Sequence, residues 1–86
     1  MFTMIVETTS ATTGETLTST TTHDTEEHAL HHINSVIGHV NEVAAANDMP
    51  IVDPEWDAQD GGLVTEFTVT SLSGEEMYNS VSIKAD

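Results

Sequence analysis

Residues 24–47 read DTEEHALHHINSVIGHVNEVAAAN, and this stretch decides the fold. Its large apolar residues recur at intervals of three and four, which is the period of an α-helix with one buried face. The predicted helix covers about residues 25–46, and its apolar stripe consists of Leu30, Ile33, Ile37, Val40 and Ala44. A stripe of this width has to pack on another apolar surface, so the flanking segments must supply one.

Both ends of this helix carry recognisable signals. Asp24 is predicted as the N-cap, because Glu27 stands three residues later in the capping-box position. Asn47 is predicted to take the left-handed conformation that closes many helices, and Pro50 cannot continue the helix. The helix is therefore expected to end near Ala46.

The segments on either side of the helix alternate between apolar and polar residues, which is the period of a half-buried strand. The predicted strands cover about residues 2–9, 15–22, 63–71 and 77–84, with turns at Gly14 and Gly74. Residues 15–22 contain mostly threonine and are predicted as a solvated edge strand. The expected fold class is α+β, with the order ββαββ: a four-stranded antiparallel sheet with one amphipathic helix packed on one face. Residues 1–86 form a single domain.

The size of the chain and its lack of cysteine exclude several kinds of protein. A domain of 86 residues has one modest core and seldom forms the partly desolvated cleft that acid–base catalysis needs, so we expect no enzyme and no cofactor. The absence of cysteine excludes thiolate metal sites and thiol nucleophiles. No segment resembles a signal peptide or a membrane span, so the expected location is the cytoplasm, and the host cytoplasm if a phage encodes the protein.

Charge is the most unusual property of this sequence. Fifteen Asp and Glu residues stand against one basic residue, Lys84, and the formal net charge is −14. Nucleic acids and anionic membranes are bound through Lys and Arg, so direct binding to either is excluded. The expected partner is a protein with a basic surface, and a homodimer is left open.

The connection at residues 47–62 is strongly acidic and contains the stretch DPEWDAQDGG, residues 53–62. Asp53, Glu55 and Asp57 alternate as calcium ligands of an EF-hand do. That motif fails at two diagnostic positions, where Ala58 replaces glycine and Val64 replaces glutamate. A looser cation site would use Asp53, Asp57 and Asp60. Trp56 has two open interpretations: an exposed anchor for a partner, or a ring that caps the core.

Four of the five histidines lie on the predicted helix. His28, His32 and His39 share the face opposite the apolar stripe. His28 and His32 are four residues apart, so they could share a zinc or copper ion, but the glutamate of an HExxH motif is absent. Since two surface histidines bind a metal weakly, we predict no metal site and retain His28 and His32 as the candidates.

Carboxylates on regular structure can imitate the phosphates of DNA. Acidic residues that alternate along a strand are about 6.6 Å apart, close to the phosphate spacing on one strand of about 7 Å. The acids of this chain are densest in the long connection and in the last turn. The predicted partner-binding residues are Asp48, Asp53, Glu55, Trp56, Asp57, Asp60, Glu75 and Glu76.

In size, acidity and ββαββ layout, the chain resembles the small anti-CRISPR and anti-restriction inhibitors that phages and mobile elements encode. This resemblance implies an inhibitor that occupies a basic nucleic-acid-binding surface of a host defence complex, without catalysis. It carries no sequence motif, and therefore assigns no residue.

Two other interpretations remain open. Proteins of salt-loving archaea also lose lysine and gain Asp, Glu and Thr, so the acidity could be an adaptation to salt in an ordinary domain. Alternatively, the chain could be an assembly subunit that uses the threonine-rich edge strand for β-augmentation.

Overall fold

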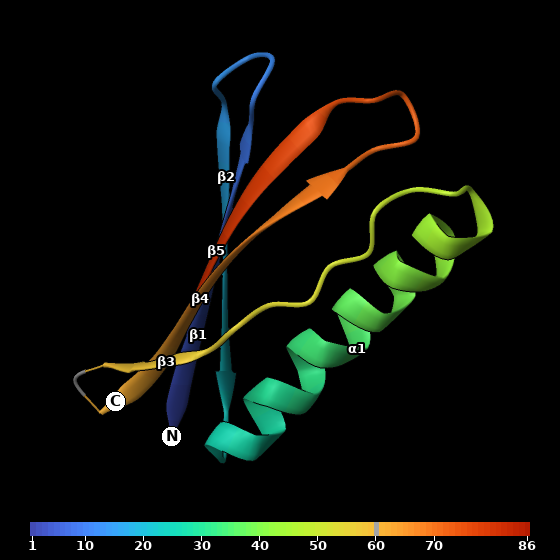
Figure 1. Cartoon of the computed structure of the whole chain (residues 1–86). Coiled ribbons are helices and arrows are strands. Elements are labelled where there is room, and N and C mark those ends of the chain that lie inside the picture. The colour runs from blue at the N-terminus through green and yellow to red at the C-terminus, as the bar shows by residue number, and fades with distance from the viewer. Residues whose placement is uncertain (60) are drawn as a thin grey trace.

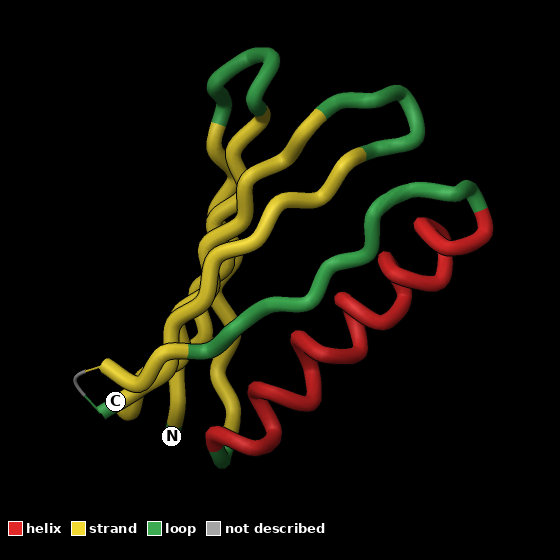
Figure 2. Tube along the Cα trace, in the orientation of Figure 1, coloured by secondary structure: helices red, strands yellow, loops and turns green. Residues whose placement is uncertain are grey.

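The computed structural model describes residues 1–59 and 61–86, which form one helix and five strands (Figure 1). In chain order, the elements are β1 (Phe2–Ser10), β2 (Thr16–His23), α1 (Glu26–Ala46), β3 (Asp57–Gln59), β4 (Gly62–Thr70) and β5 (Glu76–Ala85). The predicted α+β class is confirmed. The helix lies along one side of the sheet, and the connection from α1 to β3 runs between them (Figure 2).

The strands form one antiparallel sheet in the order β2-β1-β5-β4-β3. Each of the hairpins β1–β2 and β4–β5 is local in sequence, and the pairing of β1 with β5 joins them at the centre of the sheet. In that pairing Met4 lies opposite Ile83. The two ends of the chain therefore lie side by side, and the backbone N–H of Asp86 donates to the carbonyl of Met1 at 3.0 Å.

The prediction of four strands was wrong by one, because β3 lies inside the predicted connection. β3 pairs with β4 from Asp57 opposite Val64 to Gln59 opposite Gly62. Its three residues, DAQ, are too few to show a period and contain no β-branched side chain. A Cβ on Gly62 would lie 2.1 Å from the carbonyl oxygen of Ile83, so this close pairing of β4 with β5 requires glycine.

The predicted end of the helix at Ala46 is confirmed, but both caps differ from the prediction. Thr25 is the N-cap instead of Asp24, since its hydroxyl accepts from the backbone N–H of His28 at 3.1 Å. At the other end the positive φ of 59° belongs to Asp48, whereas Asn47 has a φ of −115°. Each capping residue was therefore predicted one position too early in the sequence.

The core lies between α1 and one face of the sheet. Met4, Val81 and Ile83 are its most deeply buried sheet residues, and Ala29, Ile33 and Ile37 enter it from the helix. Two other apolar residues of α1, Val36 and Val43, remain 49% and 40% exposed. The helix contacts β1, β2 and β5, and the opposite face of the sheet is open in the part of the chain that the structure describes.

Candidate functional site

The connection from α1 to β3 is fixed in place near its middle. The side-chain amide of Asn41 on α1 donates to the carbonyl of Val52 at 2.8 Å and accepts from the N–H of Val52 at 2.7 Å. The Val52 side chain is 8% exposed and belongs to the core. This double hydrogen bond satisfies both backbone groups of a buried residue, and so holds the start of the acidic segment against the helix.

The next part of the connection is held by the sheet. The hydroxyl of Thr65, a buried residue of β4, donates to the carbonyl of Glu55 at 2.5 Å. The ring of Trp56 is half-buried and packs against the core, which is the core-capping interpretation of this residue. β3 then pairs with β4. The acidic side chains of the connection therefore project from a backbone that is anchored at four consecutive points.

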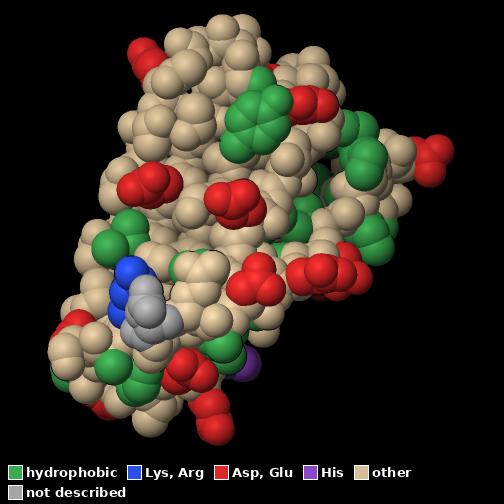
Figure 3. All heavy atoms as spheres, turned by 60° about the vertical axis from the view of Figure 1, so that its left-hand side comes forward, with side chains coloured by type: hydrophobic (Ala, Val, Ile, Leu, Met, Phe, Trp, Pro, Cys, Tyr) green, Lys and Arg blue, Asp and Glu red, His purple; other side chains and the backbone are tan. Residues whose placement is uncertain are grey.

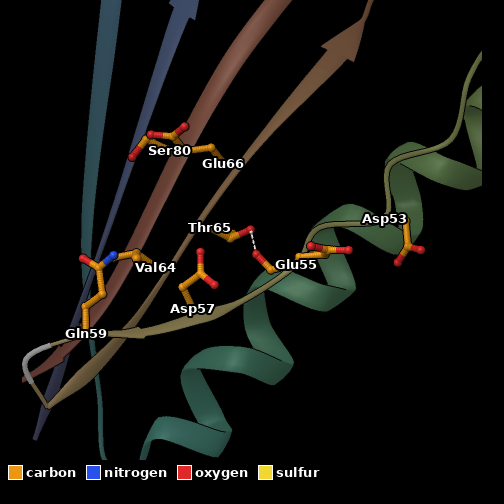
Figure 4. A pocket seen from close by; sticks show the side chains of 8 residues that line it. All are labelled: Asp53, Glu55, Asp57, Gln59, Val64, Thr65, Glu66 and Ser80. Carbon is orange, nitrogen blue, oxygen red and sulfur yellow. Dashed lines mark hydrogen bonds between the residues drawn. The ribbon is translucent and has the colours of Figure 1, made fainter.

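These anchors create an acidic groove between the connection and β4, with a volume of about 680 Å³. Four exposed carboxylates line it: Asp53, Glu55, Asp57 and Glu66. We use the term acidic groove for this hollow together with its four carboxylates. Figure 4 shows Glu55 and Asp57 beside Thr65, Glu66 higher on β4, and Asp53 at the far end near α1. Val64, Gln59 and Ser80 complete its walls.

The acidic groove continues onto the open face of the sheet. Ser80 of β5 pairs with Glu66 on one side and with Glu7 of β1 on the other, so the two carboxylates stand in one row across the sheet. Since neighbouring strands are about 4.8 Å apart, the backbones of Glu7 and Glu66 are separated by about 9.6 Å. A second hollow of about 360 Å³ lies over this row and reaches Tyr78.

Asp53, Glu55 and Asp57, three of the predicted partner-binding residues, line the same groove in the structure. The sequence prediction missed Glu7 and Glu66 as members of the same surface, although their period-two positions put both on the polar face of their strands. Figure 3 shows acidic side chains scattered over one side of the molecule, with several hydrophobic side chains between them.

The remaining predicted partner residues lie elsewhere. Asp48 follows the C-terminus of α1, and Glu75 and Glu76 lie at the β4–β5 turn, at the end of the sheet opposite β3. The carboxylate of Glu75 also accepts a hydrogen bond from the buried hydroxyl of Ser10, which ties it into the fold. Asp60 lies outside the described residues.

The two candidate metal ligands meet a third histidine that the sequence prediction did not use. The ring centroids of His28 and His32 lie 5.2 Å and 5.4 Å from that of His23, the last residue of β2. His23 is only 7% exposed, and its Nε2 lies 2.9 Å from the hydroxyl of Thr21. Its Nδ1 is buried and has no hydrogen-bond partner among the described residues. Side chains alternate between the two faces of a strand, and this alternation along β2 turns His23 toward the helix. The position of His23 could therefore have been predicted from the sequence.

The surroundings of His23, the buried histidine of this cluster, disfavour its protonated form. Burial lowers the pKa of His23, and the neighbouring His28 and His32 lower it further, while Asp24 acts in the opposite direction. In the part of the chain that the structure describes, no three histidine, cysteine, aspartate or glutamate side chains are arranged to hold a metal ion.

Within the described residues, no helix combines the length and the apolar character needed to cross a membrane. Comparisons of the chain with protein-family models, with curated proteins and with solved structures give no significant match.

Proposed function

We propose that this protein is a non-enzymatic acidic binding protein that blocks a basic nucleic-acid-binding surface of a host defence complex by imitating DNA. One observation carries the proposal: the carboxylates of the acidic groove are exposed, and they project from a backbone that is fixed by packing and hydrogen bonds. A fixed array loses little conformational entropy when a partner binds it.

The spacing of the array supports this proposal. Asp57 lies opposite Val64, two residues before Glu66 on the neighbouring strand. One strand spacing combined with two residues of rise separates their backbones by about 8 Å. Glu7 lies about 9.6 Å from Glu66 across the sheet. The first interval is close to the phosphate interval of about 7 Å on one DNA strand, and the second is about a third longer. Lys and Arg side chains are long and flexible enough to reach carboxylates at both intervals.

The shape of the site favours binding over catalysis. All four carboxylates of the acidic groove are exposed, and the groove is a broad hollow at the edge of a sheet. General acid–base catalysis depends on carboxyl groups whose pKa is shifted by a closed, partly desolvated site. Binding a partner protein needs no closed site, because a protein surface can cover an open groove of this kind.

The test is affinity capture from host lysate with a matched pair of variants. The groove variant combines Asp53→Asn, Glu55→Gln, Asp57→Asn and Glu66→Gln. The control variant removes the same number of charges elsewhere, through Glu15→Gln, Asp24→Asn, Glu27→Gln and Glu42→Gln. We expect the protein and the control variant to capture a nucleic-acid-binding complex, and duplex DNA to compete with both.

Capture should be lost with the groove variant, and also at roughly 1 M salt, where the Debye length is about 3 Å. Equal loss with both variants would mean that total charge, and not the acidic groove, determines binding. If duplex DNA does not displace the captured complex, DNA mimicry is excluded as the mode of binding.

A specific observation also favours the second candidate, an ordinary domain from a salt-loving source. Acidic side chains outside the groove are spread over the strands, the helix and the turns, which is how salt adaptation distributes them. Circular dichroism separates the candidates. A salt-adapted domain loses its fold below about 0.5 M salt because unscreened charges repel one another, whereas an inhibitor that works in an ordinary cytoplasm keeps it.

A further inference from the structure

The two edges of the sheet are built differently. The edge formed by β3 is three residues long and carries the charge of Asp57. The edge formed by β2 is eight residues long, and residues 16–22 contain no charged side chain, although the chain has fifteen acids. β2 pairs with β1 in continuous register from Thr16 to His23, so this strand contains no bulge.

An edge strand of this kind offers unpaired backbone N–H and C=O groups to another strand. Proteins commonly prevent such pairing with short edges, charged side chains, proline or bulges. β3 has the first two of these protections, and β2 has none of the four. The side chains of β2 are also suited to a sheet, because most of them are β-branched threonines, and Leu17 is 73% exposed beside them.

We propose that β2 is a self-association surface, through which two copies of this chain pair β2 with β2 in antiparallel orientation about a two-fold axis. The five described strands of each copy then form one continuous sheet. This inference does not rest on the proposed function, because the acidic groove lies at the opposite edge of each sheet.

A second copy fits this edge better than a charged partner does. The uncharged strand offers no charge complementarity, whereas antiparallel self-pairing sets threonine rows against threonine rows, a favourable cross-strand pair. It also covers Leu17 of each copy. A two-fold contact uses both β2 edges at once, and the short, charged β3 edge does not extend the sheet, so the assembly stops at a dimer.

Charge makes the predicted dimer dependent on salt. Antiparallel pairing brings the start of one β2, next to Glu15, toward the end of the other, next to Asp24. These carboxylates repel each other at both ends of the contact, and each copy carries a net charge of −14. Salt screens this repulsion, so association should strengthen as salt is added.

The experiment measures the mass of the full chain by light scattering after size exclusion, at roughly 0.05 M and 1 M salt. Protein concentration is varied up to roughly 1 mM, so that a weak dimer is detected. We expect a dimer that forms more readily at high salt. Hydrogen exchange at high salt should show concentration-dependent protection within residues 16–23, at the amides that point away from β1.

Three variants locate the contact. Thr20→Lys puts a charge in the middle of the β2 edge and should leave a monomer, whereas Thr68→Lys makes the same change on the open face of β4 and should dimerise as before. Glu15→Lys should strengthen the dimer several-fold at low salt, because it turns repulsion into attraction. Circular dichroism confirms that each variant is folded.

The proposal is overturned if the unmodified chain stays monomeric at 1 mM in high salt, if Thr20→Lys and Thr68→Lys behave alike, or if the protected amides lie outside β2.

Discussion

The two faces of the sheet are made by the same strands and have opposite properties. Under α1, Met4, Val81 and Ile83 are at most 2% exposed. One residue along the strands, the open face carries Glu7, Ser80 and other exposed polar groups. The comparison teaches that the fold obtains its stability from one face, so the charges of the other face can change with little effect on folding. The expected effects of substitutions can test this separation.

The largest effect is expected on the covered face. Ile83→Ala removes a fully buried side chain at the centre of the core and should lower the free energy of unfolding by about 3 kcal/mol. Ser80→Ala changes an exposed residue of the same strand and should alter stability by less than about 0.5 kcal/mol. Urea denaturation followed by circular dichroism measures both. Similar losses would show that the open face also stabilises the fold.

Trp56, in the connection that leads into β3, packs against the core of the covered face. Its ring is half-buried on the core, so Trp56→Ala should cost about 2 kcal/mol, less than the roughly 3–5 kcal/mol of a fully buried aromatic. Ile51→Ala changes a residue of the same connection that is 65% exposed, so it is the control and should be nearly neutral. If Trp56→Ala is equally neutral and weakens partner binding, the ring acts as an anchor instead.

His23 is a titratable group on the covered face, and its pKa is lowered by burial and by His28 and His32. The unfolded state therefore binds a proton at this histidine more readily than the folded state does. The contribution of neutral His23 to the free energy of unfolding is present above about pH 6.5, and it is lost as the pH falls below that value. The stability of the protein relative to a His23→Gln variant should therefore decrease between pH 7.5 and pH 5.5. The comparison variant is His39→Gln, which changes a histidine outside the cluster; an equal trend with that variant would assign the effect to general charge.

The smallest effect is expected on the open face. Glu66→Gln removes one of two carboxylates that share a row with Ser80, so it should raise stability by about 0.3 kcal/mol at low salt. The gain should vanish at roughly 1 M salt, where exposed charges are screened. A loss of stability at either salt concentration would mean that Glu66 makes a favourable contact in the folded state.

The sequence predicted the parts of this fold that repeat with a clear period. The helix and the four long strands were placed within one or two residues, because each is long enough to show its pattern. β3 was missed since three residues show no period, and the caps were misplaced because Asp24 and Thr25 are both good N-cap residues and only the backbone decides between them.

The candidate site was predictable to a smaller extent. Asp53, Glu55 and Asp57 are neighbours in sequence and could be grouped before the structure was known. Their association with Glu66 and Glu7 depends on which strands are adjacent and in which register, and neither is set by local pattern. The meeting of His23 with two helix histidines likewise depends on where the helix packs.

The central pairing of β1 with β5 has a consequence for how the chain folds. Thr3 and Asp86, whose side chains are hydrogen-bonded, are 83 positions apart. Each hairpin can form from neighbouring residues, but the strand pair that unites them must wait until the two ends of the chain have met. Closure of so long a segment is entropically costly, and sheets of high contact order fold slowly. During synthesis the sheet cannot be completed until its last strand has left the ribosome, and until then the unpaired edge of the first hairpin is open to other chains.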